Sequence, residues 1–97
     1  MRYEIILSPE SVEDLKQLEA RVRAKVKELI EVHLRHEPTK GSKSRIKRLR
    51  GLRRPQYRLR IDEIRVFYDV EKNRVEILAI ISKSKAIEWL EKEGEKI

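Results

Sequence analysis

KGSKSRIKRLRGLRRPQYRLRIDEIRVFYDV, residues 40–70, carries the strongest structural pattern in the chain. Its first part, Lys40 to Arg60, contains ten Lys or Arg residues and no Asp or Glu. Two alternating segments follow, Tyr57–Ile61 (YRLRI) and Ile64–Val70 (IRVFYDV), in which the basic residues occupy every second position. Successive side chains of a strand point to opposite faces of a sheet, so this pattern predicts two strands with one cationic face.

Asp62-Glu63, between the two segments, is expected to form a two-residue hairpin turn. Such a turn fixes the register, which would pair Ile61 with Ile64, Arg60 with Arg65, and Arg58 with Phe67. Directly opposed like charges destabilise a sheet, so an exposed Arg60–Arg65 pair needs a reason, and a phosphate bound between two guanidinium groups is one. The alternative is that nearby carboxylates neutralise both arginines; the candidates are Asp62, Asp69 and Glu76.

The same register divides the hairpin into two faces. The apolar face is expected to pack on helices and comprises Tyr57, Leu59, Ile61, Val66 and Tyr68. The opposite face would carry Arg58, Arg60, Arg65 and Phe67.

Upstream, Arg2–Leu7 has the apolar content of a strand that is buried on at least one face. Ser8-Pro9-Glu10 is a helix start, since Ser8 can cap, Pro9 suits the first helical turn and Glu10 complements the helix dipole. Apolar residues then recur at three- and four-residue steps, at Val12, Leu15, Leu18, Val22, Val26, Leu29, Ile30 and Leu34. The interval from Pro9 to about His36 is therefore predicted to be two helices with a break near residues 18–21, or one kinked helix.

Pro38 and Gly41 end the helical region. The basic residues 42–54 are interrupted by Gly51 and have three apolar anchors, Ile46, Leu49 and Leu52, and no helix or strand is assigned to them.

Downstream, Glu71-Lys-Asn73 is predicted to be a turn, and Arg74–Ile81 a strand buried on both faces. Ser82 or Ser84 can cap a closing helix that runs to about Glu93 and ends at Gly94. The residues expected to face inward from this helix are Ala86, Ile87 and Leu90.

The predicted fold is therefore α+β, in the order β-α-α-β-β-β-α. Three consecutive strands on short turns form an antiparallel meander, and the first strand reaches this sheet through a helical crossover. We expect a small antiparallel sheet with the two N-terminal helices packed on one face. With 97 residues, the chain is expected to be a single domain, 1–97.

The net charge is +7, but residues 40–60 contribute +10, so the remainder is slightly acidic. A local basic patch attracts polyanions, so nucleic acid or an acidic partner segment is the expected ligand. The absence of cysteine excludes disulfide and thiolate chemistry. No apolar run is long enough to span a bilayer, so a cytoplasmic location without membrane association is expected. His33 and His36 are expected to be surface residues, and no metal or other cofactor is predicted.

Three segments in this order and spacing resemble the RelE/ParE toxin family of bacterial and archaeal toxin–antitoxin systems: Lys47–Gly51 (KRLRG), Tyr57–Ile61 (YRLRI) and Arg65–Tyr68 (RVFY). The resemblance runs from the opening strand to the apolar strand that ends at Ile81. It implies a cytoplasmic toxin that forms a hetero-oligomer with a cognate antitoxin. Its RelE-like branch comprises endoribonucleases that cleave messenger RNA in the ribosomal A site, so messenger RNA and the ribosome would be further partners.

The resemblance also implies roles for single residues. Arg65 would stabilise the transition-state phosphate, and Arg58 or Arg60 would help to activate the nucleophile and bind the RNA backbone. Where the family often has another Arg after the last strand, this chain has Lys83 and Lys85. Where the family has a tyrosine near the C-terminus, the nearest residues are Trp89 and Leu90. Trp89 is able to stack on a base or, alternatively, to pack the final helix. The remaining residues expected to bind RNA are Lys43, Arg45, Lys47, Arg48, Arg50, Arg53 and Arg54.

Two other functions stay open at this point. A ParE-like toxin would block DNA gyrase without cutting RNA. A non-catalytic member would act as a binding module on RNA, DNA or the ribosome.

Overall fold

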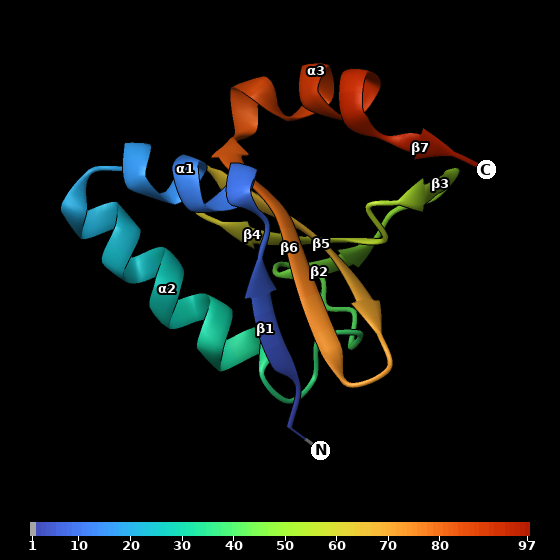
Figure 1. Cartoon of the computed structure of the whole chain (residues 1–97), viewed down its shortest axis with the longest axis horizontal. Helices are drawn as coiled ribbons and strands as arrows, with labels where there is room; N and C mark the ends of the chain where they lie inside the picture. The colour runs from blue at the N-terminus through green and yellow to red at the C-terminus, as the bar shows by residue number, and fades with distance from the viewer. Residues whose placement is uncertain (1) are drawn as a thin grey trace.

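A five-stranded sheet in the order β1-β6-β5-β4-β2 forms the centre of the computed structural model, which describes residues 2–97 (Figure 1). The elements are β1 (Glu4–Leu7), α1 (Pro9–Gln17), α2 (Ala20–Leu34), β2 (Ile46–Arg48), β3 (Leu52–Arg54), β4 (Tyr57–Ile61), β5 (Ile64–Glu71), β6 (Arg74–Ser82), α3 (Lys83–Glu93) and β7 (Glu95–Lys96). The predicted α+β class and the β4–β5–β6 meander are confirmed. β1 differs from the expected antiparallel arrangement, because it lies parallel to β6. Parallel neighbours need a long crossover, and the intervening helices supply part of it.

The β4–β5 hairpin has the predicted register. Arg60 opposes Arg65, and Arg58 opposes Phe67. In the two-residue turn only Asp62 takes a left-handed conformation, with φ of 51°. Asp tolerates this region better than Glu does, so the order Asp-Glu suits the turn.

The helix start and the helix break are also confirmed. Ser8 is the N-cap of α1, and its Oγ accepts a hydrogen bond from the backbone N of Ser11 at 3.1 Å. α1 ends at Gln17 and α2 begins at Ala20, and the intervening Leu18 has an extended backbone. The helical part of the crossover is thus a pair of helices, and both lie on one side of the sheet in Figure 1.

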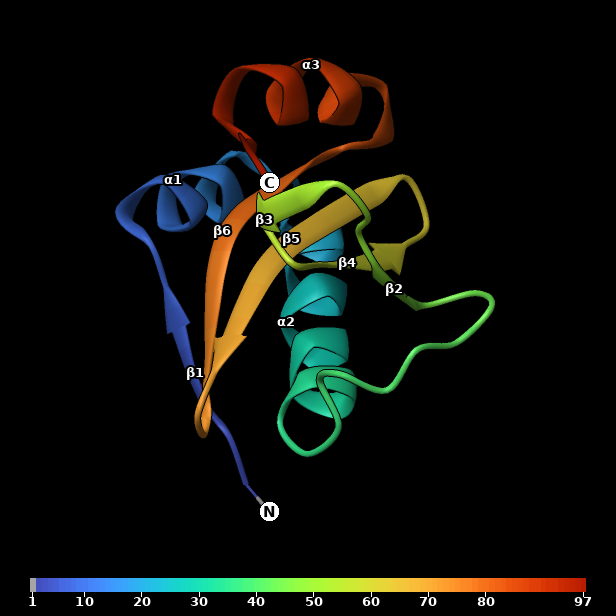
Figure 2. The same ribbon diagram turned by 90° about the vertical axis from the view of Figure 1, so that its right-hand side faces the viewer.

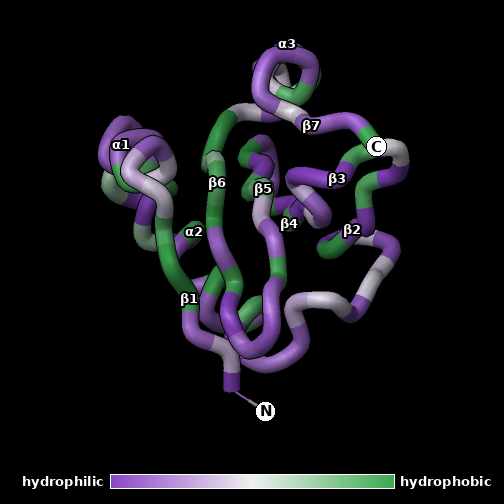
Figure 3. The backbone as a smooth tube through the Cα atoms, turned by 45° about the vertical axis from the view of Figure 1, so that its right-hand side comes forward, coloured by the Kyte–Doolittle hydropathy of each residue, from purple (hydrophilic) through white to green (hydrophobic). Residues whose placement is uncertain are grey.

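The main core lies between these helices and the sheet. Figure 2 shows α2 behind the strands, and Figure 3 shows β1 in the green of hydrophobic residues. The core residues include Val26, Ile30, Leu34, Leu59, Ile61, Val66, Tyr68, Val75, Ile77 and Ile80. The residues predicted for the apolar face of the hairpin all belong to this cluster or pack against it.

Tyr68 crosses the core and fixes the chain that follows α2. Its side chain is fully buried, and its hydroxyl donates a hydrogen bond to the carbonyl O of Pro38 at 2.7 Å. Burial raises the pKa of Tyr68 far above its ordinary value, so this phenol stays protonated in the folded protein.

We expect Tyr68→Phe to lower the free energy of unfolding by about 1–2 kcal/mol and the melting temperature by about 5–10 °C. The change leaves the buried Pro38 carbonyl without its donor and removes no carbon atom from the core. Thermal unfolding followed by circular dichroism measures the effect. Tyr57→Phe is the matched control, and an equal loss in both variants would show that the Pro38 bond contributes nothing.

The predicted element order assigns no strand to the interval from Ser42 to Arg54, and in this respect it is wrong. This interval contains β2, at the edge of the sheet, and β3, which pairs with β7 in a separate two-stranded ribbon. β3 pairs with a segment distant in sequence, and β2 is a strand of only 3 residues at the edge of the sheet, so local propensity did not indicate them. Ile46 is buried as predicted, and Leu49 and Leu52 are half-buried.

α3 covers the face of the sheet opposite α2. A second, smaller core joins Phe67 and Ala79 of the sheet to Ala86 of α3. Trp89 stacks on Phe67, with ring centroids 5.1 Å apart and an interplanar angle of 10°. The prediction that Ile87 faces inward is wrong, since this residue is 72% exposed. Because Trp89 and Ala86 face the sheet, Ile87 lies on the side of α3 that faces solvent.

Serine residues lie at the N-terminus of α3 and at the contact between α1 and the sheet, and they make different hydrogen bonds there. Ser82 is the N-cap residue of α3, but its hydroxyl makes no capping bond and instead lies 3.1 Å from the hydroxyl of Ser84. On α1, Ser11 Oγ donates to the carbonyl of Ile77 at 3.1 Å, where the β5–β6 register shifts. α1 is thereby tied to an irregularity in β6.

Candidate functional site

Four basic side chains from three neighbouring strands share the face of the sheet opposite α2. Cross-strand partners lie on the same face, and the pairs here are Lys47 with Arg58 and Arg60 with Arg65. We call this group the cationic face; it consists of Lys47, Arg58, Arg60 and Arg65. None of the salt bridges among residues 2–97 involves it. The face therefore retains its positive charge for a ligand.

Arg58 lies at the centre of the cationic face and is half-buried. Among the described residues, 2–97, its Nε is buried without a hydrogen-bond partner. Burial lowers the pKa of Arg58 below its ordinary value, and the charges of Arg65 and Arg60 lower it further. An arginine remains protonated at neutral pH despite such a shift. The charged form of Arg58 is thus destabilised by its surroundings, and a bound anion would stabilise it.

Arg65 has a different environment from the one expected for it. It is 7% exposed, and its Nη1 donates to the carbonyl O of Asp62 at 2.8 Å and of Ile64 at 3.0 Å. The expectation that both members of the Arg60–Arg65 pair are exposed is therefore wrong for Arg65, whereas Arg60 is exposed. The guanidinium of Arg65 satisfies the carbonyls of the hairpin turn, so this residue also has a structural role.

The alternative in which nearby carboxylates neutralise Arg60 and Arg65 is not what the structure shows. The Asp62 carboxylate pairs with Lys25 Nζ at 2.5 Å. Asp69 and Glu76 pair with Arg54 instead. Asp69 follows Arg65 by four residues on the same strand, roughly 13 Å away, so it is too distant to form that ion pair.

The start of α3 lies at the same end of the sheet as Arg60 and Arg65. The backbone N of Lys83 donates to the carbonyl O of Glu63, in the hairpin turn, at 2.6 Å. Lys83 and Lys85 are exposed in the first turn of this helix. The structure thus brings the lysine segment to the turn that carries the cationic face.

The other basic candidates lie around this face or apart from it. Arg45 is next to it, since its Nη1 donates to the carbonyl O of Arg60 at 3.2 Å. Arg48 lies over the ring of Tyr57, 5.2 Å from the centroid, and Tyr57 belongs to the opposite, apolar face. Lys43, Arg50 and Arg53 are exposed on the connections to β2 and on β3.

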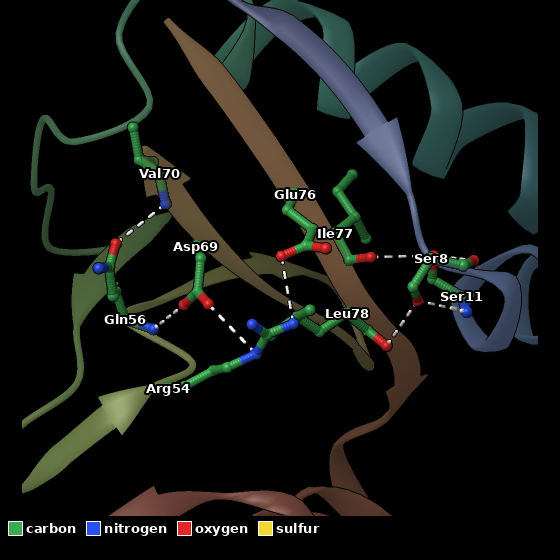
Figure 4. Close-up of polar contacts among 9 residues, drawn as sticks. All are labelled: Ser8, Ser11, Arg54, Gln56, Asp69, Val70, Glu76, Ile77 and Leu78. Atoms are coloured by element: carbon green, nitrogen blue, oxygen red, sulfur yellow. Dashed lines mark hydrogen bonds and ion pairs between the residues drawn. The ribbon is translucent and has the colours of Figure 1, made fainter. Parts of the chain in front are cut away.

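Arg54 and Trp89, both predicted to bind RNA, also make contacts within the protein. Arg54 Nε lies 3.4 Å from Asp69 Oδ2, and its Nη2 lies 3.1 Å from Glu76 Oε1 (Figure 4). Trp89 presents one face of its ring to Phe67. Of the two alternatives for Trp89, packing of the final helix is the one that this contact shows.

A polar cluster formed by the end of β3, the residue before β4, and strands β5 and β6 was missed by sequence reasoning. Arg54, Gln56, Asp69 and Glu76 line a cavity of about 430 Å³. The backbone N of Gln56 donates to Asp69 Oδ1 at 2.8 Å, and the side chain of Asp69 is 14% exposed. Its only sequence signal was a polar residue at the end of each alternating segment, which is also typical of a solvated strand end.

Burial raises the pKa of Asp69 above its ordinary value, against the opposing effects of the Gln56 hydrogen bond and Arg54. The folded protein therefore binds this proton more tightly than the unfolded chain does. Asp69 should make no pH-dependent contribution below about pH 4, where both states are protonated, and should destabilise increasingly as the pH rises through the folded pKa.

Asp69→Asn removes this titration and keeps an oxygen acceptor for Gln56. We expect the melting temperature of the variant, relative to that of wild type, to rise between about pH 4 and pH 7. Calorimetry across this range measures the difference. A difference that falls with pH would show that attraction to Arg54 outweighs the cost of burial.

No helix in the described part of the chain is long and apolar enough to cross a membrane. Within residues 2–97, no three His, Asp or Glu side chains come together as potential metal ligands. His33 is half-buried on α2, and burial, followed by the charge of Arg45, lowers its pKa.

Comparison with known proteins identifies relatives of this fold. The RelE–RelB complex from Pyrococcus horikoshii OT3 contains a similar chain, with 24% identity and a TM-score of 0.71 over 88% of this chain and 99% of that one. The RelB–RelE complex from Methanococcus jannaschii gives 19% identity and a TM-score of 0.68 over 87% and 96%. The YoeB dimer from Staphylococcus aureus gives 26% identity and a TM-score of 0.60 over 81% and 94%. No curated protein sequence matches the chain.

The family comparison agrees with the fold. The sequence profile described as "ParE toxin of type II toxin-antitoxin system, parDE" matches residues 5–87, from β1 into α3. This range includes the β4–β5 hairpin, so the family resemblance of the sequence is confirmed. With a matching profile over most of its length and the fold of RelE chains, the protein belongs to the RelE/ParE family of toxins from type II toxin–antitoxin systems.

Proposed function

We propose that this toxin is an endoribonuclease that cleaves messenger RNA on the ribosome. The observation that supports the proposal best is the cationic face, which presents four basic residues without an ion pair among residues 2–97. At its centre lies Arg58, half-buried and repelled by two neighbouring arginines. A phosphodiester would supply the counter-charge that this site lacks.

The chemistry required is attack of the RNA 2′-hydroxyl on the adjacent phosphorus. The 2′-hydroxyl gives its proton to water as the 2′-oxygen bonds to phosphorus. The bond from phosphorus to the 5′-oxygen then breaks, and that oxygen takes a proton from water. Negative charge concentrates on the phosphorane oxygens, and preorganised cations stabilise it. We assign this stabilisation to Arg58 and Arg65, and binding of the adjacent backbone to Arg60. Lys83 and Lys85 would neutralise the next phosphate.

We further propose that a cognate antitoxin binds this chain as a hetero-oligomer in the cytoplasm. The similar chains from P. horikoshii and M. jannaschii were solved as complexes of RelE with RelB. The basic residues around the cationic face, Lys43, Arg45, Arg50 and Arg53, are proposed to contact RNA outside the cleavage site, and Lys47 to contact the RNA backbone beside Arg58.

A second candidate function is inhibition of DNA gyrase without RNA cleavage. Two observations favour it: the matching profile is that of ParE, and Trp89, near the position where the resemblance implies a tyrosine, is packed on Phe67. Trp89 has no phenol to act as an acid or base.

Primer extension on messenger RNA in programmed ribosomes tests the first function. We expect discrete cuts in the A-site codon when the toxin is added, and none when the antitoxin is present. Absence of cuts, together with inhibition of gyrase in a supercoiling assay, would establish the second function instead. Absence of both effects would leave a non-catalytic binding module.

A further inference from the structure

The β4–β5 ladder ends in an unusual way next to the cationic face. Its last backbone pair is Tyr57 with Tyr68. Beyond it, two side chains replace the backbone bonds, as Figure 4 shows. The backbone N of Gln56 donates to Asp69 Oδ1 at 2.8 Å, and the backbone N of Val70 donates to Gln56 Oε1 at 2.9 Å. We call this reciprocal pair of bonds between Gln56 and Asp69–Val70 the clasp.

The clasp also connects the sheet to the basic segment. The carbonyl O of Gln56 accepts hydrogen bonds from the backbone N of Leu49 at 2.8 Å and from Arg48 Nη1 at 2.9 Å. Gln56 therefore links β5 on one side to the end of β2 on the other. The preceding residue, Pro55, has no N–H and is unable to extend the ladder.

The surroundings of Asp69 fix its carboxylate. Oδ1 accepts the Gln56 bond, while Oδ2 lies 3.4 Å from Arg54 Nε. The other charged groups that line the cavity are Glu71, Arg74 and Glu76, and Glu95 acts on Asp69 from β7. Gln56 is half-buried, and the Asp69 side chain is 14% exposed. Loss of the carboxylate would leave the Gln56 N–H without its acceptor.

We propose that Gln56 and Asp69 are positioning residues, which hold the start of β4 so that Arg58 is aimed at the ligand of the cationic face. The inference rests on the proposed function, because it assumes that this face binds RNA phosphates. Arg58 follows Gln56 by two residues and lies on the same cross-strand row as Lys47. Its Nε is enclosed by protein, so a small displacement of β4 would change which donors reach a phosphate. In enzymes, a displacement of a reacting group by about 1 Å is enough to lower the reaction rate about a hundredfold.

A test compares Asp69→Leu with Asp69→Asn and Glu71→Leu in binding to a single-stranded RNA oligonucleotide. Leu has the same branching at Cγ as Asp but no acceptor, whereas Asn keeps one. We expect Asp69→Leu to bind about tenfold more weakly, the effect of one lost charge-assisted contact, and Asp69→Asn to recover most of the affinity. Glu71→Leu makes the same change of charge at an exposed site on β5, and should bind as well as wild type or better.

The salt dependence separates misplacement from simple instability. Loss of one phosphate contact should reduce the slope of log K against log salt by about 0.7 in Asp69→Leu. A smaller folded fraction would weaken binding by the same factor at every salt concentration and leave the slope unchanged, which would overturn the proposal. Equal affinity of Asp69→Leu and wild type would overturn it as well.

Two further variants keep the test decisive. If Asp69→Leu does not fold, Gln56→Leu, which removes only the acceptor of the Val70 bond, is compared with Gln56→Glu, which retains it. Arg58→Ala reports on the proposed function itself. If Arg58→Ala weakens binding and the clasp variants do not, only the clasp inference fails. If Arg58→Ala also binds like wild type, the cationic face is not the RNA site.

Discussion

Arg58→Ala is expected to reduce RNA cleavage at least about a hundredfold, which corresponds to about 2.7 kcal/mol of lost transition-state stabilisation. The physical reason is that this residue supplies a cation at the centre of the cationic face, with an Nε that has no partner among residues 2–97. Single-turnover cleavage on programmed ribosomes, measured by primer extension, gives the rate constants.

The same substitution should leave the melting temperature unchanged or raise it. Burial and the charges of Arg65 and Arg60 all disfavour the charged form of Arg58 in the folded protein. Its removal therefore relieves repulsion, as expected for a residue that is kept for function. Arg74→Ala, at an exposed position of β6, is the control with the same change of charge. A folded Arg58→Ala variant with full activity would contradict the assignment.

Arg65→Ala is expected to lower the free energy of unfolding by about 2 kcal/mol and the melting temperature by about 10 °C. Arg65 is 7% exposed, and its guanidinium donates to the carbonyls of Asp62 and Ile64. Truncation leaves these acceptors without their donor and opens a cavity beside the hairpin turn. Relief of the repulsion from Arg58 reduces the loss without cancelling it.

Arg60→Ala is the natural comparison, because Arg60 faces Arg65 directly and is exposed. We expect it to change the melting temperature by less than about 2 °C. Equal stability of the two variants would show that the turn bonds of Arg65 are replaced by water at no cost. Loss of cleavage in Arg65→Ala has two explanations, unfolding and lost catalysis, so Arg58→Ala is the clearer test of the site.

Several features of this protein were determined by the sequence alone. Alternation within Tyr57–Ile61 and within Ile64–Val70, broken only by Phe67, specified two strands. The two-residue gap at Asp62-Glu63 fixed their register, because a shift by one residue would expose Leu59 and Val66. The three- and four-residue spacing after Ser8-Pro9 specified the helices in the same way. These are local patterns whose meaning does not depend on distant partners.

The tertiary structure decided the rest. β3 pairs with β7, which is distant in sequence, and the side of α3 that faces the sheet follows from stacking of Trp89 on Phe67. The surroundings of each charged side chain likewise depend on residues from other parts of the chain. The sequence placed Arg54, Arg58 and Arg65 in one basic stretch, yet Arg54 pairs with acids, Arg65 bonds to a turn and Arg58 has a buried, unpartnered Nε within residues 2–97. Burial and counter-charges come from other strands, so the chain order of the residues could not reveal which arginine is free to meet a phosphate.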